Sequence, residues 1–542
     1  DWPTQNIGEI TMDWRNQTLW VGTGENNSSR SSYSGIGILK TEPNGSSWVN
    51  VGLSDSHHIG KIIINPSDKD HVIVGVTGHL YSKNKNRGVY VSNDGGETWK
   101  NTLYINDTTG IIDMAVTPNS FNIMYASAWE KDRKAWNLDE DGKSSAIYKS
   151  IDGGETWDKI SKENSGFPVG EGVGRIGIAV YDENIVYAVL DNQYRRELKT
   201  QNENLTKESF KDISVDNFKK IKTEDLNRFL RSNRFPKKYN AESVNSDINS
   251  GKIEPNDLYS YLVNANSELF DTPVIGAEVY KSVDGGQSWK KTHETYLEGL
   301  YYSYGYYFGK IHVDPNNSDK IYTYGVPLIS SDDGGKTFYS IGKENVHADH
   351  HDLWINPNKP GHLINGNDGG VNITYDDGKN WIKNNSTEVG QFYSINVDYQ
   401  KPYNVYGGLQ DNGVWMGPHN SIESKRWNMT GKYPWKSILG GDGMEVQIDN
   451  RNPNIVYTGS QFGFYSRLDL ETGKRRSIKP VHELGQSPFR FNWQTPIRLS
   501  SHNQDVLYYG SNFLHRSSDK GESWKTISDD LTNGGKMGNV PY

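Results

Sequence analysis

Apolar residues along the chain recur in short blocks that alternate with polar turns. In the repeated pattern, an apolar strand is followed by a turn rich in Asn, Pro and Asp and then by a strand bearing Tyr or Val. Half-buried and fully buried β-strands have this patterning. It predicts paired strands within residues 61–75, 113–126, 310–325, 352–366, 394–407, 445–459 and 498–510.

A second motif, a glycine-containing turn that ends in an aromatic residue, alternates with the first. Six copies share a Ser or Thr, an Asp two positions later and a Gly before the aromatic residue, at 92–99, 150–157, 282–289, 331–338, 374–381 and 517–524. A degenerate copy of this motif ends at Trp48. The hydroxyl and carboxylate groups can bond nearby backbone N–H groups, and Gly permits positive φ, so each copy predicts a tight hairpin.

The spacing of these turns predicts the architecture. Most consecutive copies place their aromatic residues 43 to 58 residues apart. The 132 residues from Trp157 to Trp289 fit one unit plus an insertion, and the 143 residues from Trp381 to Trp524 fit three units. Units of four short strands at this period are typical of propeller blades. We predict an all-β fold with a single large β-propeller of nine or ten four-stranded blades; two separate propellers and a stacked β-solenoid are the alternatives.

The long interval contains a segment without the strand pattern. Residues 193–272 are rich in Lys, Glu and Asn, and 223–231 and 255–269 have helical spacing, with Pro255 suited to a first helical turn. We predict a small helical insertion in one blade, with propeller blades over 1–192 and 273–542. A solvated helical surface accounts for this composition, and a lid or partner-docking element is the alternative.

Composition narrows the classes of function. The 542 residues include no Cys, which excludes disulfides, thiolate catalysis and Cys-bound metals. A net charge of −9 without a long basic run argues against a nucleic-acid partner. No apolar run is long enough for a transmembrane segment.

The six glycine-containing turns resemble the Asp-boxes (BNR repeats) of sialidases, xyloglucanases and sortilin-type receptors. The closer resemblance is to sortilin-like, glycosyl-hydrolase-like bacterial envelope proteins, and it extends over nearly the whole chain. It includes the segments GTGE at 22–25, GRIG at 174–177, ADHHD at 348–352, GNDGG at 366–370, GGLQDNG at 407–413 and GGDG at 440–443. The resemblance implies a protein exported to the periplasm, the cell surface or the extracellular space, with an envelope protein as a further partner. The Arg triad of sialidases is not recognised.

Strand connectivity sorts the remaining distinctive residues onto one face. If the strands of a blade are called A to D, the A–B and C–D turns lie at one end of the up-and-down sheet, and the B–C and D–A loops lie at the other. The histidine-rich, Gly-Asp and aromatic segments all fall in B–C or D–A loops. Because binding and catalysis gather on such loops, we predict that this face is functional and that the Asp-box face has only turn chemistry.

A histidine cluster is the densest group on the predicted face. His347, Asp349, His350 and His351 are predicted ligand-binding residues. Imidazole and carboxylate groups can also ligate a divalent metal or supply a general base, although alternation along a strand limits how many point one way. The alternative is that these side chains bond neighbouring loops and line the central channel.

Carboxylates in glycine-rich loops are the catalytic candidates: Asp368, Asp411, Asp442 and Glu25. Two carboxylates about 5–9.5 Å apart can hydrolyse a glycosidic bond. The alternative is that each Asp caps a tight turn.

Aromatic residues in the same loops are predicted to bind ligand: Tyr302, Tyr304, Trp129, Trp415 and Trp493. Such rings stack on sugars or cover peptide side chains, and packing between blades is the alternative.

These observations favour an extended peptide or glycan ligand bound on the B–C/D–A face or in the central channel. A glycoside hydrolase with a carboxylate pair on that face is the first alternative. The second is a metal-dependent hydrolase that uses His347, Asp349 and His350 or His351. No cofactor and no resident metal are predicted.

Overall fold

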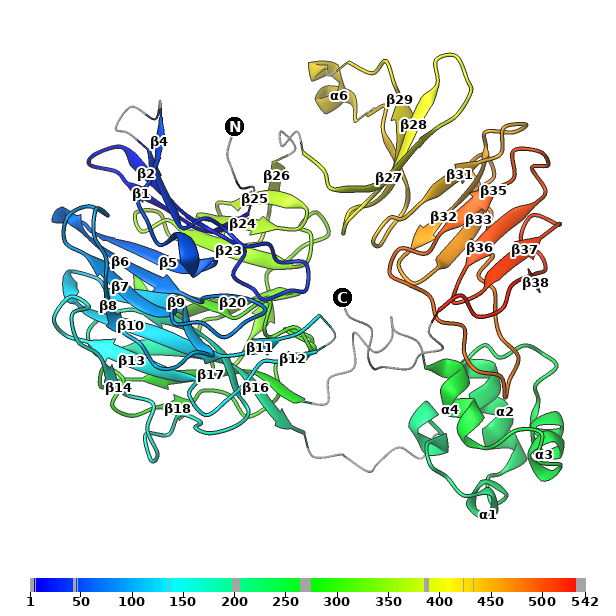
Figure 1. Ribbon diagram of the computed structural model, residues 1–542, viewed down its shortest axis with the longest axis horizontal. Helices are drawn as coiled ribbons and strands as arrows, with labels where there is room; N and C mark the ends of the chain where they lie inside the picture. Colours follow the sequence, from blue (N-terminus) through cyan, green and yellow to red (C-terminus); the bar gives the residue numbers. More distant parts are fainter. Residues whose placement is uncertain are drawn as a thin grey trace. The chain divides into compact units, whose positions relative to one another are not determined.

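The computed structural model describes residues 4, 6–41, 45, 47–135, 137–196, 205–263, 274–384, 389–422, 424–431 and 433–532. The described strands form nine four-stranded sheets and one two-stranded hairpin, which confirms the all-β prediction. Contacts divide the chain into two compact units (Figure 1). Unit 1 comprises residues 1–197 and 270–387, and unit 2 comprises residues 198–269 and 388–542.

Six of the described four-stranded sheets belong to unit 1, and we call the strands of each sheet A to D in chain order. The first sheet contains β1 (Ile7–Asp13), β2 (Thr18–Thr23), β3 (Ile38–Thr41) and β4 (Trp48–Asn50), and the second contains β5 (Ile59–Asn65), β6 (Asp68–Val76), β7 (Gly88–Ser92) and β8 (Lys100–Leu103). The third sheet contains β9 (Thr109–Thr117), β10 (Ser120–Glu130), β13 (Ala146–Ser150) and β14 (Asp158–Lys159), and the fourth contains β15 (Val173–Val180), β16 (Val186–Arg195), β17 (Val274–Ser282) and β18 (Lys290–Lys291). The fifth sheet contains β19 (Lys310–Asp314), β20 (Asn317–Tyr324), β21 (Leu328–Ser331) and β22 (Tyr339–Ser340), and the sixth contains β23 (His350–Ile355), β24 (Leu363–Asn367), β25 (Gly370–Thr374) and β26 (Ile382–Asn384).

Two short elements interrupt the loops of unit 1. The hairpin β11 (Asp132–Arg133) and β12 (Leu138–Asp139) lies in the B–C connection of the third sheet. The 3-10 helix η1 (Ser54–Ser56) lies between the first two sheets.

Unit 2 contains the three remaining described four-stranded sheets. They are β27 (Phe392–Val397), β28 (Asn404–Leu409), β29 (Gly413–Pro418) and β30 (Lys436–Leu439); β31 (Val446–Ile448), β32 (Ile455–Ser460), β33 (Phe464–Asp469) and β34 (Arg475–Ser477); and β35 (Ile497–Leu499), β36 (Leu507–Gly510), β37 (Leu514–Ser517) and β38 (Lys525–Thr526), with α6 (Lys425–Thr430) between β29 and β30.

Every four-stranded sheet is a simple antiparallel meander in the order A-B-C-D. In the sixth sheet, for example, β23 pairs with β24, β24 with β25, and β25 with β26, all antiparallel. The A–B and C–D turns therefore share one end of each sheet, which we call the Asp-box end. The B–C and D–A loops share the other, which we call the loop end.

The Asp-boxes form one repeated hydrogen-bond network. In the second sheet, Ser92 Oγ accepts the Gly96 N–H at 2.8 Å and donates to Asp94 Oδ1 at 2.7 Å, and Asp94 Oδ1 accepts the Thr98 N–H at 2.9 Å. Gly96 has a φ of 98°, which a residue with a Cβ adopts only with strain. The other five boxes repeat these bonds. Each turn is thus fixed by side chains within eight residues.

The indole groups of several Asp-boxes link neighbouring sheets. The Nε1–H group of Trp99 donates to the Val51 carbonyl at 2.7 Å, and that of Trp381 donates to the Ile341 carbonyl at 2.8 Å. Both carbonyls follow the last strand of the preceding sheet. The aromatic residue therefore holds its sheet against the one before it.

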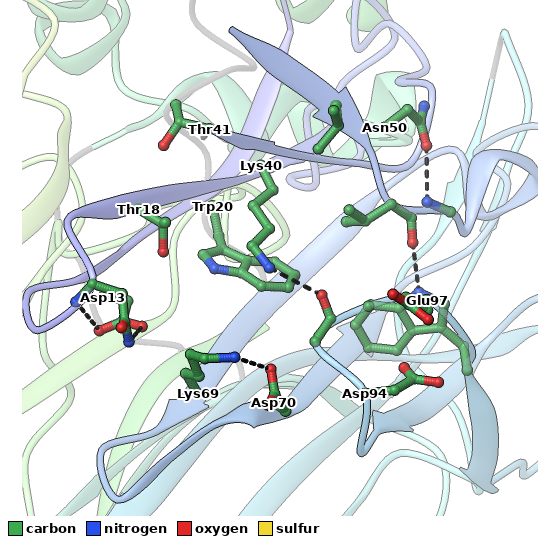
Figure 2. A pocket seen from close by; sticks show the side chains of 17 residues that line it. Asp13, Thr18, Trp20, Lys40, Thr41, Asn50, Lys69, Asp70, Asp94 and Glu97 are labelled. Atoms are coloured by element: carbon green, nitrogen blue, oxygen red, sulfur yellow. Dashed lines mark hydrogen bonds and ion pairs between the residues drawn. The ribbon is translucent and has the colours of Figure 1, made fainter. Parts of the chain in front are cut away.

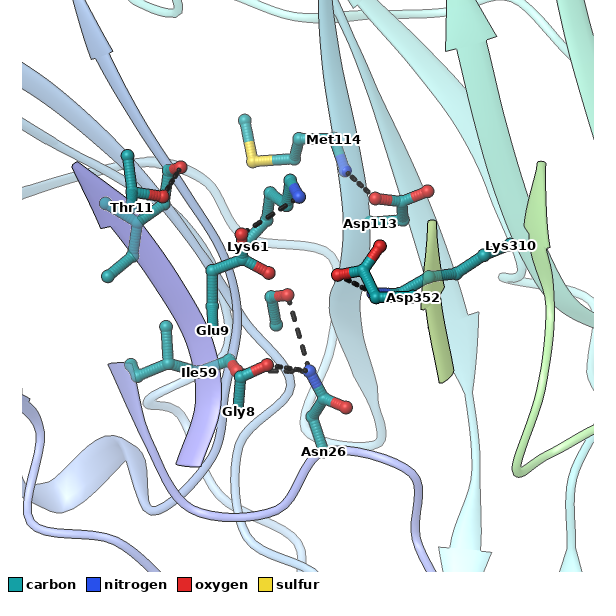
Figure 3. Close-up of polar contacts among 12 residues, drawn as sticks. Gly8, Glu9, Thr11, Asn26, Ile59, Lys61, Asp113, Met114, Lys310 and Asp352 are labelled. Atoms are coloured by element: carbon teal, nitrogen blue, oxygen red, sulfur yellow. Dashed lines mark hydrogen bonds and ion pairs between the residues drawn. The ribbon is translucent and has the colours of Figure 1, made fainter. Parts of the chain in front are cut away.

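The inner A strands of unit 1 meet around a charged axis (Figure 3). Lys61 on β5 pairs with Glu9 on β1 at 3.0 Å, and Lys310 on β19 pairs with Asp352 on β23 at 3.2 Å. Burial alone would lower the pKa of Lys61, but Glu9 and Asp113 hold it above its ordinary value. Asp352 acts on Lys61 in the same way, so A strands of several sheets face one another as in a propeller.

A group of helices lies between β16 and β17 of the fourth sheet. Its described elements are η2 (Lys207–Phe210), α1 (Val215–Phe218), α2 (Thr223–Ser232), α3 (Ala241–Asn249) and α4 (Asn256–Leu262). Pro255 immediately precedes α4, which ends at Leu262, so the predicted helical segment of 255–269 is shorter in the structure, and 264–269 lie outside the described residues.

The insertion packs as part of unit 2. Phe210, Phe229 and Leu258 form a buried core with Leu484 from the β34–β35 connection. The Tyr239 hydroxyl accepts the Leu484 N–H at 3.0 Å. An element inserted into a sheet of unit 1 therefore has its hydrophobic partners in unit 2. The prediction of one ring with nine or ten blades stays a prediction.

Candidate functional site

The predicted site residues divide between the two units. Unit 1 contains Glu25, Trp129, Tyr302, Tyr304, His347, Asp349, His350, His351 and Asp368, and unit 2 contains Asp411, Trp415, Asp442 and Trp493. Within unit 1, the members from the fifth and sixth sheets come together at the loop end.

The histidine cluster surrounds the first residues of β23. His350 is buried, and its Nδ1 lies 2.7 Å from Asn365 Oδ1. Burial lowers the pKa of His350 to about 4, although the Asn365 bond raises it. The neighbouring His351 points the other way along the strand, with its Nε2 2.5 Å from Asp368 Oδ1. Asp349 has a φ of 60° and its carbonyl accepts the Asp368 N–H at 3.2 Å.

The His351–Asp368 pair is suited to proton transfer. A carboxylate that bonds one imidazole nitrogen orients the ring and leaves the other nitrogen to accept or donate a proton. Two candidates nominated separately, one as a ligand-binding residue and one as a catalytic carboxylate, thus act on each other directly.

A pocket of about 470 Å³ opens beside this cluster, between the fifth and sixth sheets. His347 and His350 line it together with the apolar side chains of Val326, Pro327, Leu328, Val346 and Ala348, and Lys343 and Glu344 add charge. Leu328 and His350 are the first residues of β21 and β23. The other residues named here belong to the B–C turn of the fifth sheet or to the D–A loop that follows this sheet. The pocket combines an apolar wall with a few polar groups, the usual make-up of a ligand site.

The tyrosine-rich D–A loop between the fourth and fifth sheets lies against His351. The ring centroids of Tyr307 and His351 are 5.6 Å apart in an edge-on arrangement, and Phe308 stacks on His351 at 6.2 Å. Arg175 Nη1 donates to the carbonyls of Tyr306 and Tyr307 at 3.0 and 3.2 Å. The predicted Tyr302 and Tyr304 belong to this loop, where Tyr302 has a φ of 51°.

A buried aspartate, Asp191, and a partly buried glutamate, Glu140, lie under this loop and were not predicted from the sequence. Burial raises the pKa of Asp191 on β16 to about 7. Burial, and then the nearby charges of Asp191 and Asp141, raise the pKa of Glu140 well above its ordinary value. A Cβ at Gly305 would lie 1.9 Å from Asp191 Cγ, so the loop backbone rests directly on that carboxyl group.

Polar atoms without partners concentrate at the loop end of unit 1. Some described residues of unit 1 have a buried side-chain polar atom that bonds no described residue: Ser56, His58, Asn84, Arg87, Thr117, Glu140, Arg175, Asp191, Arg196 and Tyr301. All of them except Thr117 belong to a B–C or D–A loop or to a strand end beside one. Buried polar groups in proteins are almost always paired, with protein, water or ligand. This end therefore has hydrogen-bonding capacity that the described chain does not use.

Two further predicted residues of unit 1 have structural contacts. Trp129 is 1% exposed, and its Nε1–H group donates to the Glu140 carbonyl at 2.7 Å. The Glu25 N–H donates to the Tyr33 carbonyl at 3.3 Å within the B–C loop of the first sheet. Trp129 therefore positions the chain beside the buried carboxylate.

The predicted residues of unit 2 lie at the loop end of their own sheets. Asp442 is 8% exposed and accepts the Asp411 N–H at 3.0 Å, while Asp411 has a φ of 59°. Trp415 Nε1–H donates to the Asn412 carbonyl at 2.7 Å, and Trp493 Nε1–H to the Tyr393 hydroxyl at 2.8 Å. The Asp411–Asp442 contact is that of a turn-capping carboxylate.

The Asp-box end of unit 1 is not only a set of turns. A pocket of about 680 Å³ lies between the first and second sheets at this end (Figure 2). Its lining includes Trp20, Lys40, Asp70 and Trp99. The expectation that this end has turn chemistry alone is therefore incomplete.

Within the described part of the chain, no group of three or more His, Asp or Glu residues is arranged to hold a metal ion.

Among the described helices, none has both the length and the apolar character needed to span a bilayer.

The Asp-box resemblance is confirmed by a family comparison. Residues 90–101 match the BNR/Asp-box repeat family, which places the match on the turn of the second sheet. No curated protein matches the chain.

Solved structures with a similar chain course include two GH74 enzymes. The Niastella koreensis GH74 enzyme is 15% identical, with a TM-score of 0.34, over 96% of this chain and 69% of that one. The GH74 xyloglucanase from Xanthomonas campestris is 14% identical, with a TM-score of 0.34, over 98% of this chain and 80% of that one.

Proposed function

We propose that the loop end of unit 1 binds an extended peptide or glycan. The observation that carries this proposal is the pocket of about 470 Å³ lined by His347 and His350. Its volume falls within the usual range for ligand pockets of roughly 300–1,000 Å³. Its wall is apolar, which favours an aliphatic or aromatic peptide side chain, or the apolar face of a sugar ring.

The surroundings of the pocket supply polar contacts for the rest of an extended ligand. The His351–Asp368 pair and the edge of the tyrosine-rich loop adjoin it. The unpartnered polar atoms beneath these loops are enclosed, so buried water rather than the ligand can satisfy them. An extended chain laid over these loops would use the pocket, the pair and the loop edge at once.

Arrays of peptides and glycans probed with the whole chain provide the test. The tightest ligand is then titrated calorimetrically against the unaltered chain and two variants. We expect His347→Ala to weaken binding about tenfold, equivalent to ~1.4 kcal/mol. Val346→Asp, which puts a charge in the apolar wall, should weaken it further.

The matched control is Lys336→Ala, an exposed position in the Asp-box of the same fifth sheet. Binding that is unaffected by both pocket variants would overturn the proposal, and so would the absence of any ligand on the arrays.

A glycoside hydrolase is the second candidate, because the predicted catalytic carboxylate Asp368 bonds His351 at the loop end. A carboxylate beside an imidazole can take part in the proton transfers that glycoside hydrolysis requires. The test is release of reducing ends from polysaccharides that bind. Asp368→Asn should lower kcat at least about a hundredfold while binding persists. Unchanged activity in this variant would remove this candidate.

Export is a further part of the proposal, supported by the resemblance to envelope proteins. Fractionation of cells that make the full-length protein tests it: recovery outside the cytoplasm is expected, and recovery in the cytoplasm alone would contradict it. The single ring of nine or ten blades is also proposed, and an image of the full-length particle that shows separate rings would overturn it.

A further inference from the structure

The pocket at the Asp-box end of unit 1 is a second site, independent of the proposed function. It lies between the first two sheets and is about 680 Å³ in volume, enough to contain a sugar residue (Figure 2). Its residues come from the B, C and D strands of the first sheet, the A–B turns of both sheets, the start of the D–A loop after β4 and the Asp-box of the second sheet.

Tryptophan and lysine side chains build the inner wall. Trp20 is buried, and the Lys40 ammonium lies 4.6 Å from its ring centroid. The same ammonium donates to the Gly95 carbonyl at 3.2 Å. The charge of Lys40 is therefore already engaged by a ring and a carbonyl.

The wall at Gly95 remains open because this residue has no side chain. A Cβ there would lie 2.9 Å from Asp70 Oδ1 and 3.6 Å from Lys40 Nζ. The Gly of the Asp-box thus serves the turn, with a φ of 70°, and also keeps the pocket from being filled.

The lining has a formal excess of two negative charges, from Asp13, Asp70, Asp94 and Glu97 against two lysines. Three of these carboxylates have partners in the chain: Asp13 accepts from Asn16 at 2.7 Å, Asp70 pairs with Lys69 at 2.6 Å, and Asp94 is bonded within the Asp-box. Glu97 is exposed at the rim. It is the carboxylate placed to meet a ligand.

We propose that this pocket binds a sugar residue that carries an amino group. Apolar surface from Val49 and Trp99 suits the face of a pyranose ring, and the threonine hydroxyls of Thr18 and Thr41 suit its hydroxyl groups. The Glu97 carboxylate, in a negative surrounding field, selects an ammonium group over a neutral or anionic substituent.

The test compares three monosaccharides, glucosamine, glucose and glucuronate, by ligand-observed NMR titration of the whole chain at about pH 6 and low salt. We expect glucosamine to bind at least about fivefold more tightly than glucose, with glucuronate weakest, because charge complementarity in low salt is weakly screened. Glu97→Gln should bring glucosamine within about twofold of glucose.

The chain contains a matched control for Glu97. Glu155 occupies the same position in the next Asp-box, where it pairs with Lys100 at 2.7 Å. Glu155→Gln should leave the preference for glucosamine intact. The proposal is overturned if none of the three sugars binds, if glucose or glucuronate binds as tightly as glucosamine, or if the preference survives in Glu97→Gln.

Discussion

The two ends of the unit 1 sheets are built on opposite principles. At the Asp-box end, one sequence motif recurs and produces the same bonds each time, such as the Gly96 N–H to Ser92 Oγ and Gly154 N–H to Ser150 Oγ contacts at 2.8 and 2.9 Å. At the loop end no motif recurs, and buried polar atoms lack partners in the described chain. Apart from the Thr117 hydroxyl, the described buried side-chain polar atoms of the first end satisfy one another, whereas several of the second end do not.

This difference predicts how substitutions at each end should behave. Variants at the Asp-box end should lower the free energy of unfolding by an amount that does not depend on pH, because neutral packing and short-range bonds are lost. Variants at the loop end should change how that free energy depends on pH, because titratable groups are buried there. The following predictions test this contrast.

The largest expected effect comes from the indole of Trp289, the last residue of the Asp-box of the fourth sheet. Its side chain is 5% exposed and packs on Phe167 with ring centroids 5.5 Å apart. Trp289→Ala should lower the free energy of unfolding by about 4 kcal/mol, at every pH from about 5 to 8. Hydrogen exchange of β16 and β17 provides the measurement.

An exposed tryptophan of the same unit serves as the control. Trp354 is 49% exposed. Trp354→Ala should therefore change the free energy of unfolding, measured by hydrogen exchange of its own sheet, by less than about 0.5 kcal/mol. Equal effects of the two substitutions would show that the Asp-box indole is not a packing residue.

At the loop end, Asp191 should make stability fall as pH rises. Its pKa is about 7 in the folded chain, against an ordinary value of 3.8, so the folded state holds an extra proton between these values. Stability is lost as pH rises from about 4 to about 7, on the order of 4 kcal/mol in total. Asp191→Asn should remove this loss, and Asp158→Asn, at an exposed position, should not. A steep loss that persists in Asp191→Asn would place its origin elsewhere.

His350 should act in the opposite direction. Its pKa is about 4 in the folded chain, below the ordinary value of 6.5, so only the unfolded state takes up a proton between these values. Stability should fall by up to about 3 kcal/mol as pH drops from about 6.5 to about 4. Denaturation of His350→Gln across this range should give a flatter curve, whereas an unchanged slope would contradict the burial of this imidazole.

The smallest effect is that of a single Asp-box hydroxyl. Ser150→Ala leaves the buried Gly154 N–H without its acceptor and should cost about 2 kcal/mol, independent of pH. Ser67→Ala, in an exposed A–B turn, should be neutral. A loss in Ser150→Ala that depends on pH would contradict the expected difference between the two ends.

The sequence predicts the repetitive part of the structure well because its signals are local. The A–B hairpins are visible from apolar blocks, and β23 with β24 falls within the predicted pair at 352–366 apart from a few end residues. The Asp-boxes need only residues within one turn of chain, so their bonds follow from composition and spacing.

The loop-end site was predicted only in part, because it depends on distant contacts. His351 and Asp368 were both nominated, but their pairing across 17 residues needs the β23–β24 register. Asp191 is an ordinary strand residue until the loop around Gly305 covers it. No local pattern encodes that contact, and the same holds for the ion pairs along the axis of unit 1.

The central claim is that ligand recognition belongs to the loop end of unit 1. Hydrogen exchange of the whole chain, with and without the tightest ligand from the peptide and glycan arrays, tests it most directly. We expect protection in residues 326–328 and 340–351, around the pocket lined by His347 and His350. Protection confined to the Asp-box turns, with none in these segments, would contradict the account.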